Sequence, residues 1–184
     1  YRNYGKSAAL NEGFKAASGD YIITMDADLQ DDPNEIKNLV AKLNEGWDLV
    51  SGWKKNRLDP LNKRIPSKLF NFVTRLLTGV KIHDFNCGLK GYKKSVIKSI
   101  DVYGGRHRYI PAIAGHRKFK ITEIIVNHRA RKFGSTKYGG SRLFHGFFDL
   151  ITILFLNRFN QQPLHLFGAL GIGFFLFGFL SELI

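Results

Sequence analysis

Apolar and polar residues follow one another along the first half of the chain in a pattern that predicts helices and strands in turn. Residues 5–17 place apolar side chains at helical spacing, and residues 21–25 form a short apolar run typical of a buried strand. Asp32-Pro33 predicts a helix start, with a side-chain cap followed by proline, and residues 48–52 predict the next strand. This β–α–β order predicts an α/β fold with a mostly parallel sheet flanked by helices.

The later residues are more apolar. Residues 69–77 predict a helix and residues 120–128 a further strand. Residues 141–160 predict an amphipathic helix lying in a membrane interface, with a core helix as the alternative. Residues 163–184 have no charged side chain between Leu164 and Ser181, and about 20 residues are enough to cross a bilayer, so they predict a transmembrane helix. Lys and Arg residues just before this helix place the preceding domain on the cytoplasmic side.

The amino-acid composition limits the classes of possible binding partner but does not identify one of them. The 184 residues fit one domain of ordinary size, and 28 Lys and Arg against 15 Asp and Glu give a formal net charge of +13. Such a charge favours anionic partners, which include nucleic acid, acidic lipids and phosphorylated molecules. Cys87 is the only cysteine, so no disulfide can form within the chain. The start without Met and the apolar end indicate an internal piece of a longer protein.

An acidic cluster, Asp26-Ala27-Asp28-Leu29-Gln30-Asp31-Asp32, directly follows the first predicted strand. Ligands of α/β sheets bind at the carboxyl ends of strands. Asp26, Asp28 and Gln30 offer hard oxygen ligands at alternate positions, which suit Mg²⁺ or Mn²⁺ with substrate phosphates in the remaining coordination positions. A bare Asp-x-Asp also occurs in solvated turns, but the position after a buried strand favours a metal site.

Several motifs together resemble a known family. Arg2-Asn3-Tyr4-Gly5-Lys6, Asn11-Glu12-Gly13 and the segment from Asp26 to Pro33 resemble family 2 glycosyltransferases, which have the GT-A fold. Three later stretches resemble the polyprenyl-phosphate group of that family, which includes dolichol-phosphate mannose synthase: Asp84 to Lys90, His107 to Pro111, and Asn127 to Tyr138. The resemblance implies that residues 1–140 form a partial GT-A catalytic domain whose first strands are missing.

The resemblance further implies metal-dependent, inverting transfer of a sugar from a UDP- or GDP-linked donor to a polyprenyl phosphate such as undecaprenyl or dolichyl phosphate. The expected location is the inner membrane of a bacterium. Asn3, Lys6 and Asp26 are expected to bind the donor, and Asp28 and Asp84 to act in catalysis. Asp84 would orient the acceptor or the sugar; capping a turn is the alternative role for this residue.

The acceptor phosphate is already largely ionised near neutral pH, so it needs cations and alignment rather than a strong base. The candidate phosphate-binding side chains are cationic or hydroxylic: Lys54, Arg64, Ser67, Arg131, Ser135 and Lys137.

Three other functions compete with this one. A processive polysaccharide synthase would carry a late Gln-x-x-Arg-Trp motif, but both tryptophans, Trp47 and Trp53, come early. A basic module that binds nucleic acid or acidic membranes would account for the charge but not for the acidic cluster. Transfer to a protein or a soluble sugar would leave the membrane helices unexplained. We therefore expect membrane and lipid partners and no nucleic acid; a homo-oligomer stays open.

Overall fold

The computed structural model describes residues 4–55, 61–129, 141–159 and 162–182. Four strands form one sheet in the order β1-β3-β2-β4, with β1 Tyr21–Thr24, β2 Leu49–Trp53, β3 Lys90–Lys93 and β4 Ile121–Ile125. Strand β3 is antiparallel to β1 and to β2, whereas β2 and β4 are parallel. The predicted α/β class is confirmed, and the sheet is mixed: β1, β2 and β4 run in one direction and β3 runs in the other.

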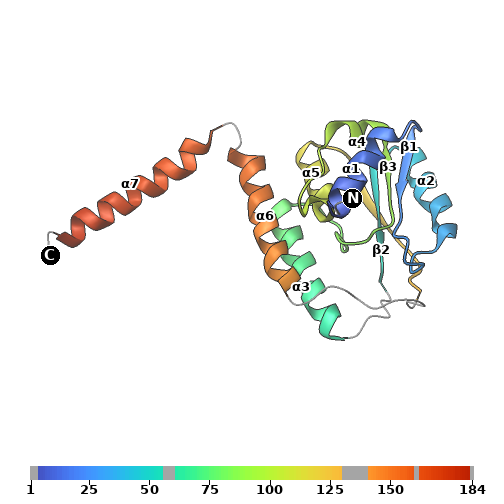
Figure 1. The fold of residues 1–184 in the computed structure, drawn as a ribbon, viewed down its shortest axis with the longest axis horizontal. Helices are drawn as coiled ribbons and strands as arrows, with labels where there is room; N and C mark the ends of the chain where they lie inside the picture. The colour runs from blue at the N-terminus through green and yellow to red at the C-terminus, as the bar shows by residue number, and fades with distance from the viewer. Residues whose placement is uncertain (1–3, 56–60, 130–140, 160–161, 183–184) are drawn as a thin grey trace.

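Helices cover both faces of the sheet (Figure 1). On one face, α1 Lys6–Ala16, α4 Lys94–Ser99 and α5 Ile110–His116 enclose a core that includes Phe14, Ile22 and Tyr92. On the other face, α2 Ile36–Asn44 buries Leu39 and Leu43 against the sheet. Successive residues of a strand point to opposite faces, which is why the short apolar runs of β1 and β2 serve both cores.

The predicted start of the second helix is confirmed in detail. The Asp32 carboxylate accepts a hydrogen bond from the backbone N–H of Asn34 at 3.1 Å. A 3₁₀ turn, η1 Pro33–Glu35, leads directly into α2. The cap fixes where the chain leaves the acidic cluster, so the cluster is held between the end of β1 and a well-defined helix.

A third core joins the sheet domain to two long helices, α3 Leu61–Thr78 and α6 Ser141–Phe159. Helix α3 is longer than predicted, because residues 61–68 continue it through Pro66. Helix α6 buries Leu150 and Ile153 in this core and exposes Phe147, Phe148 and Ile151 on its other side. A short 3₁₀ turn, η2 Arg106–Tyr109, contributes Tyr109, whose hydroxyl donates to the carbonyl of Gly146 at 2.5 Å.

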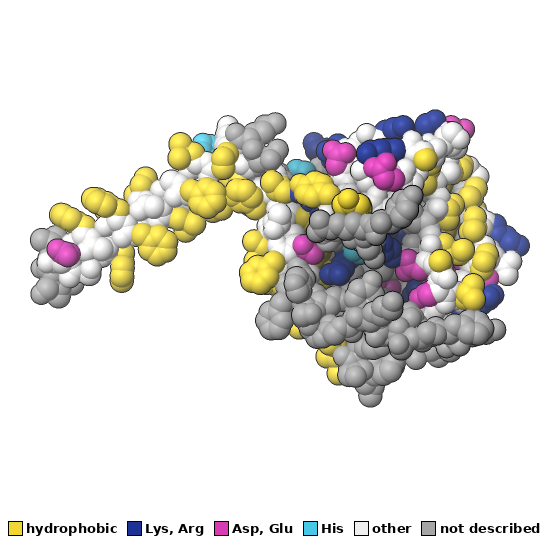
Figure 2. All heavy atoms as spheres, in the orientation of Figure 1, with side chains coloured by type: hydrophobic (Ala, Val, Ile, Leu, Met, Phe, Trp, Pro, Cys, Tyr) yellow, Lys and Arg dark blue, Asp and Glu magenta, His cyan; other side chains and the backbone are white. Residues whose placement is uncertain are grey.

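Helix α7, Pro163–Glu182, extends away from the sheet domain (Figure 1). Among the described residues it is the one helix whose length and apolar composition would allow it to cross a bilayer, and none of it is buried. Hydrophobic side chains project along its whole length in the space-filling view (Figure 2).

Candidate active site

The acidic cluster leaves the sheet at the end of β1 in a tight turn. Asp28 Oδ1 accepts a hydrogen bond from the backbone N–H of Gln30 at 3.3 Å. Leu29, between them, has a φ of 62° and an exposed side chain. A left-handed conformation is unfavourable for a bulky residue and is found mainly where the surrounding structure enforces it, often at functional sites. The chain therefore turns sharply between Asp28 and Gln30, a few residues after the end of β1.

Asp26 is held between a lysine and a glycine. Lys6 Nζ lies 2.5 Å from Asp26 Oδ1, with both side chains partly exposed. A Cβ built on Gly88 would lie only 2.4 Å from the Asp26 carboxyl carbon, so the loop packs directly against the carboxylate. Burial works to raise the pKa of Asp26, but the Lys6 hydrogen bond and the charges of Lys6, Lys54 and Lys90 outweigh it and lower the pKa below its usual value.

A second ion pair joins a buried member of the acidic cluster to the residue that follows β2. Lys54, just after β2, places Nζ 2.7 Å from Asp31 Oδ1, and the Asp31 side chain is fully buried. Burial opposes the lysine charge, but the hydrogen bond and ion pair with Asp31 help to outweigh it, so the pKa of Lys54 is raised. Lys54 was predicted as a phosphate ligand. The structure shows that its ammonium also balances a buried acid.

The loop from Asp84 to Gly88 is fixed by side chains of the sheet. Lys90 Nζ donates to the carbonyl of Phe85 at 3.1 Å and to that of Cys87, and Lys90 itself is buried, which lowers its pKa. The Asp84 carbonyl accepts from Ser51 Oγ at 3.2 Å, and the Gly88 carbonyl accepts from Thr24 Oγ1 at 2.9 Å. The loop that packs against Asp26 is therefore rigidly placed.

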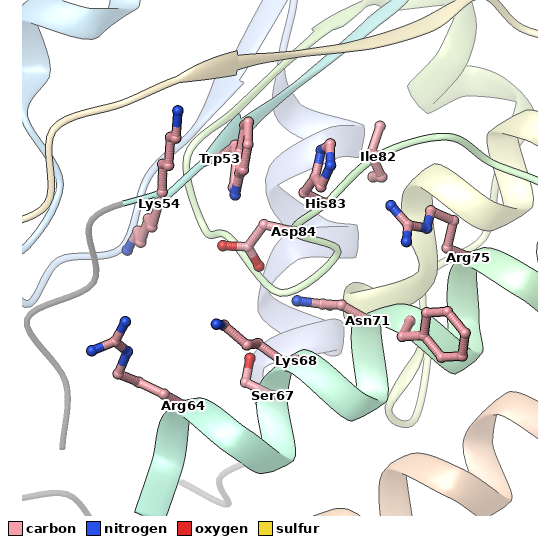
Figure 3. A pocket seen from close by; sticks show the side chains of 12 residues that line it. Trp53, Lys54, Arg64, Ser67, Lys68, Asn71, Arg75, Ile82, His83 and Asp84 are labelled. Atoms are coloured by element: carbon pink, nitrogen blue, oxygen red, sulfur yellow. The ribbon is translucent and has the colours of Figure 1, made fainter. Parts of the chain in front are cut away.

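A cavity of about 400 Å³ opens beside this loop, between β2 and α3 (Figure 3). It brings together four of the predicted residues, Lys54, Arg64, Ser67 and Asp84. Five of its lining side chains are cationic: Lys54, Lys55, Arg64, Lys68 and Arg75. The Asp84 carboxylate also accepts a hydrogen bond from the backbone N–H of Asn86 at 3.1 Å, so the turn-capping role is present alongside its place in the cavity wall.

The sequence prediction missed several residues of this cavity. Lys68, Asn71 and Arg75 follow Arg64 and Ser67 at spacings of three and four, which is one face of a helix. That spacing could have identified them if residues 61–68 had been recognised as helical. His83 stacks on Trp53 with ring centroids 4.1 Å apart, and Glu123 accepts from the backbone N–H of His83 at 2.6 Å. No sequence pattern indicated this aromatic wall.

The other side of the acidic cluster is tied to the end of β4. The N–H of Arg129 donates to the Gln30 carbonyl at 2.9 Å, and the Gln30 side-chain amide donates to the Arg129 carbonyl at 3.4 Å. The Arg129 guanidinium lies 2.9 Å from Asp32. The predicted ligands Arg131, Ser135 and Lys137 come after this point and, like Asn3, lie outside the described residues.

The candidate metal ligands are oxygen atoms of two carboxylates and one amide. In the described part of the chain, no group of three or more His, Cys, Asp or Glu side chains is arranged so that it could hold a metal ion by itself. A small set of hard oxygen ligands fits Mg²⁺ or Mn²⁺, which keep coordination positions for water and phosphate oxygens, better than it fits a closed structural metal site.

The sequence matches a known family: the family model for glycosyl transferase family 2 covers residues 1–101. The chain belongs to glycosyl transferase family 2. Over 94% of its length it is 44% identical to dodecaprenyl-phosphate galacturonate synthase of Rhizobium johnstonii, covering 52% of that protein. It is 38% identical, over 99% of its length, to undecaprenyl-phosphate 4-deoxy-4-formamido-L-arabinose transferase of Pseudomonas paraeruginosa, again covering 52%. The chain thus spans about half the length of these curated relatives.

Solved structures support the GT-A fold. Glucosyl-3-phosphoglycerate synthase from Mycobacterium tuberculosis, crystallised with Mn²⁺ and UDP-glucose, superposes with a TM-score of 0.60 at 18% identity. The match covers 83% of this chain and 54% of that protein. At this identity the likeness concerns the fold alone.

Proposed function

We propose that the protein transfers a sugar from a nucleotide-sugar donor to a polyprenyl phosphate at a membrane surface, with the help of a divalent metal ion. The observation that carries the proposal is the position of the cationic cavity. It lies between the acidic cluster and an exposed apolar side of α3. The names of the two curated relatives, both transferases or synthases of polyprenyl-phosphate sugars, support the same acceptor.

The acidic cluster forms the donor half of the site in this proposal. Asp26, Asp28 and Gln30 would hold Mg²⁺ or Mn²⁺, which neutralises the negative charge that develops on the departing nucleoside diphosphate. Lys6 lies next to Asp26 and would bind a diphosphate oxygen, and Asn3 is proposed as a further donor-binding residue. The Mn²⁺ and UDP-glucose bound by the mycobacterial structural relative support a metal-dependent UDP-linked donor; a GDP-linked donor stays an alternative.

The cationic cavity forms the acceptor half. A phosphate monoester is a dianion over much of the neutral pH range, and its oxygen needs to be aligned and desolvated rather than deprotonated. Lys54, Arg64 and Ser67 face the cavity, and the helical neighbours Lys68 and Arg75 add charge to it. Arg131, Ser135 and Lys137 are proposed to complete the phosphate site. Asp84, on the cavity wall, would orient the sugar or the acceptor, and attack from the face opposite the diphosphate would invert the anomeric centre.

The apolar side of α3 supports a membrane-bound acceptor. Ile65, Leu69, Phe72 and Leu76 follow one another at spacings of four, three and four, and each is more than half exposed, at 66%, 61%, 54% and 70%. Phe72 also lines the cavity, and the polar and cationic cavity-lining side chains of α3 lie on the adjoining face of the same helix. A polyprenyl phosphate presents a charged head next to an apolar chain, and the two faces of α3 match this arrangement.

The exposed residues of α6 and the apolar helix α7 would extend the same contact into the bilayer. We place the catalytic domain on the cytoplasmic side of a bacterial inner membrane, where its cationic surface would meet acidic lipids.

The test is transfer by the full-length protein in detergent or vesicles, with a panel of UDP- and GDP-sugars and a short polyprenyl phosphate. Product should form only with Mg²⁺ or Mn²⁺, and Asp28→Ala should reduce the rate at least a hundredfold because a metal ligand is lost. Asp101→Ala removes an exposed acid that belongs to neither the acidic cluster nor the cavity lining, and it should leave the rate unchanged. Intact transfer by Asp28→Ala would refute the metal site. Equal use of glycerol 3-phosphate would refute the lipid acceptor.

A further inference from the structure

Three lysines supply positive charge around Asp26, and they differ in what else they bind. Lys90 is buried and donates to the carbonyls of Phe85 and Cys87. Lys54 has a side chain only 12% exposed and is paired with the buried Asp31. The Lys6 side chain is 40% exposed, and among the described residues its ammonium pairs with Asp26 Oδ1, at 2.5 Å.

The first two lysines cannot leave without a large cost. Moving Lys54 would strand the Asp31 carboxylate in the interior, and moving Lys90 would strand two buried carbonyls. Lys6 can leave at little cost, because its ammonium is close to solvent and an exposed ion pair contributes little stability. Of these three ammonium groups, Lys6 is therefore the one that can exchange partners.

Asp26 is also a proposed metal ligand, and this creates a conflict. A divalent cation on the Asp26 carboxylate would be adjacent to the Lys6 ammonium, and like charges at such short range repel strongly. Gly88 packs against another side of the carboxylate, so the Asp26 side chain has little room to rotate and bind the metal ion and the Lys6 ammonium at the same time. The metal and the ammonium should therefore compete for the same carboxylate.

We propose that Lys6 holds Asp26 in the metal-free protein and transfers to the donor diphosphate when the metal binds. The inference rests on the proposed function and adds an order of events to it. The metal displaces a positive charge from Asp26, and the displaced charge is then available to the incoming anion. By linkage, donor binding at Lys6 in turn favours the metal, because it removes the competitor.

Position in the helix makes the exchange favourable. Lys6 is the first residue of α1, and the first turn of this helix contains no acidic side chain. A cation at a helix N-terminus is unfavourable unless an anion lies nearby. Asp26 is that anion in the structure, and a diphosphate, which also carries negative oxygens, can replace it.

The test measures binding rather than turnover. Mn²⁺ affinity of the full-length protein is measured by isothermal titration calorimetry without donor, and UDP and GDP affinities are then measured at saturating Mn²⁺. Lys6→Met should bind Mn²⁺ about fivefold more tightly than the wild-type protein does. This factor corresponds to the largest stabilisation expected from an ion pair this exposed. The nucleotide that binds the wild-type protein should bind Lys6→Met about tenfold more weakly, because a charge-assisted hydrogen bond is lost.

Two variants provide the controls. Lys6→Arg keeps a charge that can reach Asp26 and should stay close to the wild type in both measurements. Lys15→Met removes another lysine of α1, one paired with Glu12 at 2.7 Å, and should change neither affinity. Unchanged or weaker Mn²⁺ binding by Lys6→Met would overturn the exchange while leaving the metal site intact. Absence of Mn²⁺ binding by the wild-type protein would instead refute the metal part of the proposed function, and this inference with it.

Discussion

Gly88 packs so close to Asp26 that one added methyl group would displace the carboxylate, and this tests the candidate donor site. In Gly88→Ala, the new Cβ would lie 2.4 Å from Asp26 Cγ and Oδ2 and 2.7 Å from Oδ1. Ordinary Cβ contacts begin near 3.4 Å, so the two groups must separate by about 1 Å. Gly88 does not have a positive φ, so the expected effect comes from this contact and not from backbone strain.

Asp26 should be the group that moves. The loop around residue 88 is held by hydrogen bonds from Thr24, Ser51 and Lys90, whereas the Asp26 side chain has one weak constraint, its partly exposed pair with Lys6. Forcing Asp26 off its rotamer costs about 0.5–1.5 kcal/mol, and losing the pair costs up to about 1 kcal/mol. The folded protein should therefore lose about 0.5–2.5 kcal/mol of stability and remain folded.

The effect on function should be much larger than the effect on stability. Displacing a metal ligand by about 1 Å can cost on the order of a hundredfold in rate, and Mn²⁺ affinity should fall at least tenfold. The assays are calorimetric Mn²⁺ binding, sugar transfer to a polyprenyl phosphate, and urea denaturation. Gly13→Ala is the matched control, because Gly13 lies in α1 with nothing within 4 Å of the added Cβ. It should leave binding unchanged and keep or raise stability. Wild-type Mn²⁺ affinity in Gly88→Ala would show that this contact does not position a metal ligand.

Two further predictions concern stability and reactivity. Asp48 accepts hydrogen bonds from Lys93 Nζ and from the N–H of Lys120, which outweigh its burial and lower its pKa. Its stabilising effect is therefore present above the unfolded-state pKa and disappears as the pH falls through the folded-state value. Asp48→Asn should cost about 1–2 kcal/mol in urea denaturation at pH 7, and a deficit that does not shrink below about pH 4 would contradict this account. Burial raises the pKa of Cys87 to about 11, so iodoacetamide should label native protein at pH 8 far more slowly than urea-unfolded protein; equal labelling rates would show that the thiol is accessible.

Local patterns predicted the elements whose stability is mainly local. The apolar run of β1, the Asp32-Pro33 helix start and the uncharged stretch of α7 from Leu164 to Ser181 were all evident from neighbouring residues. Strand β3 was not, because Lys90-Gly91-Tyr92-Lys93 has two lysines and a glycine. It forms a strand because β1 and β2 pair with it on both sides, and because carbonyls of the preceding loop bind the Lys90 ammonium. Neither condition can be found within four residues of sequence.

In the candidate site, too, the features that depend on neighbouring residues were predicted and those that depend on tertiary contacts were not. Asp26, Asp28 and Gln30 could be proposed from spacing and from the preceding strand. The cationic face of α3 was only half recognised. The predicted helix began at residue 69, so Arg64 and Ser67 were not placed on one helix with Lys68, Asn71 and Arg75, which were missed. The proximity of Gly88 to Asp26, and of Lys54 to Asp31, depends on tertiary structure and had no sequence signal.

The unpredicted strand also explains how two anionic substrates could share one site. Because β1 and β2 run in the same direction with β3 between them, the residues that follow them leave the sheet at one edge, about 10 Å apart. The loop from Asp84 to Gly88 enters β3 at this edge: Gly88 touches Asp26 on the donor side, and Asp84 lines the cavity on the acceptor side. A diphosphate and a phosphate monoester repel each other, so each needs its own cations. In the proposed function, the metal and Lys6 balance the first, and the cavity lysines and arginines balance the second. The loop on β3 keeps the two sets apart while the sugar passes between them.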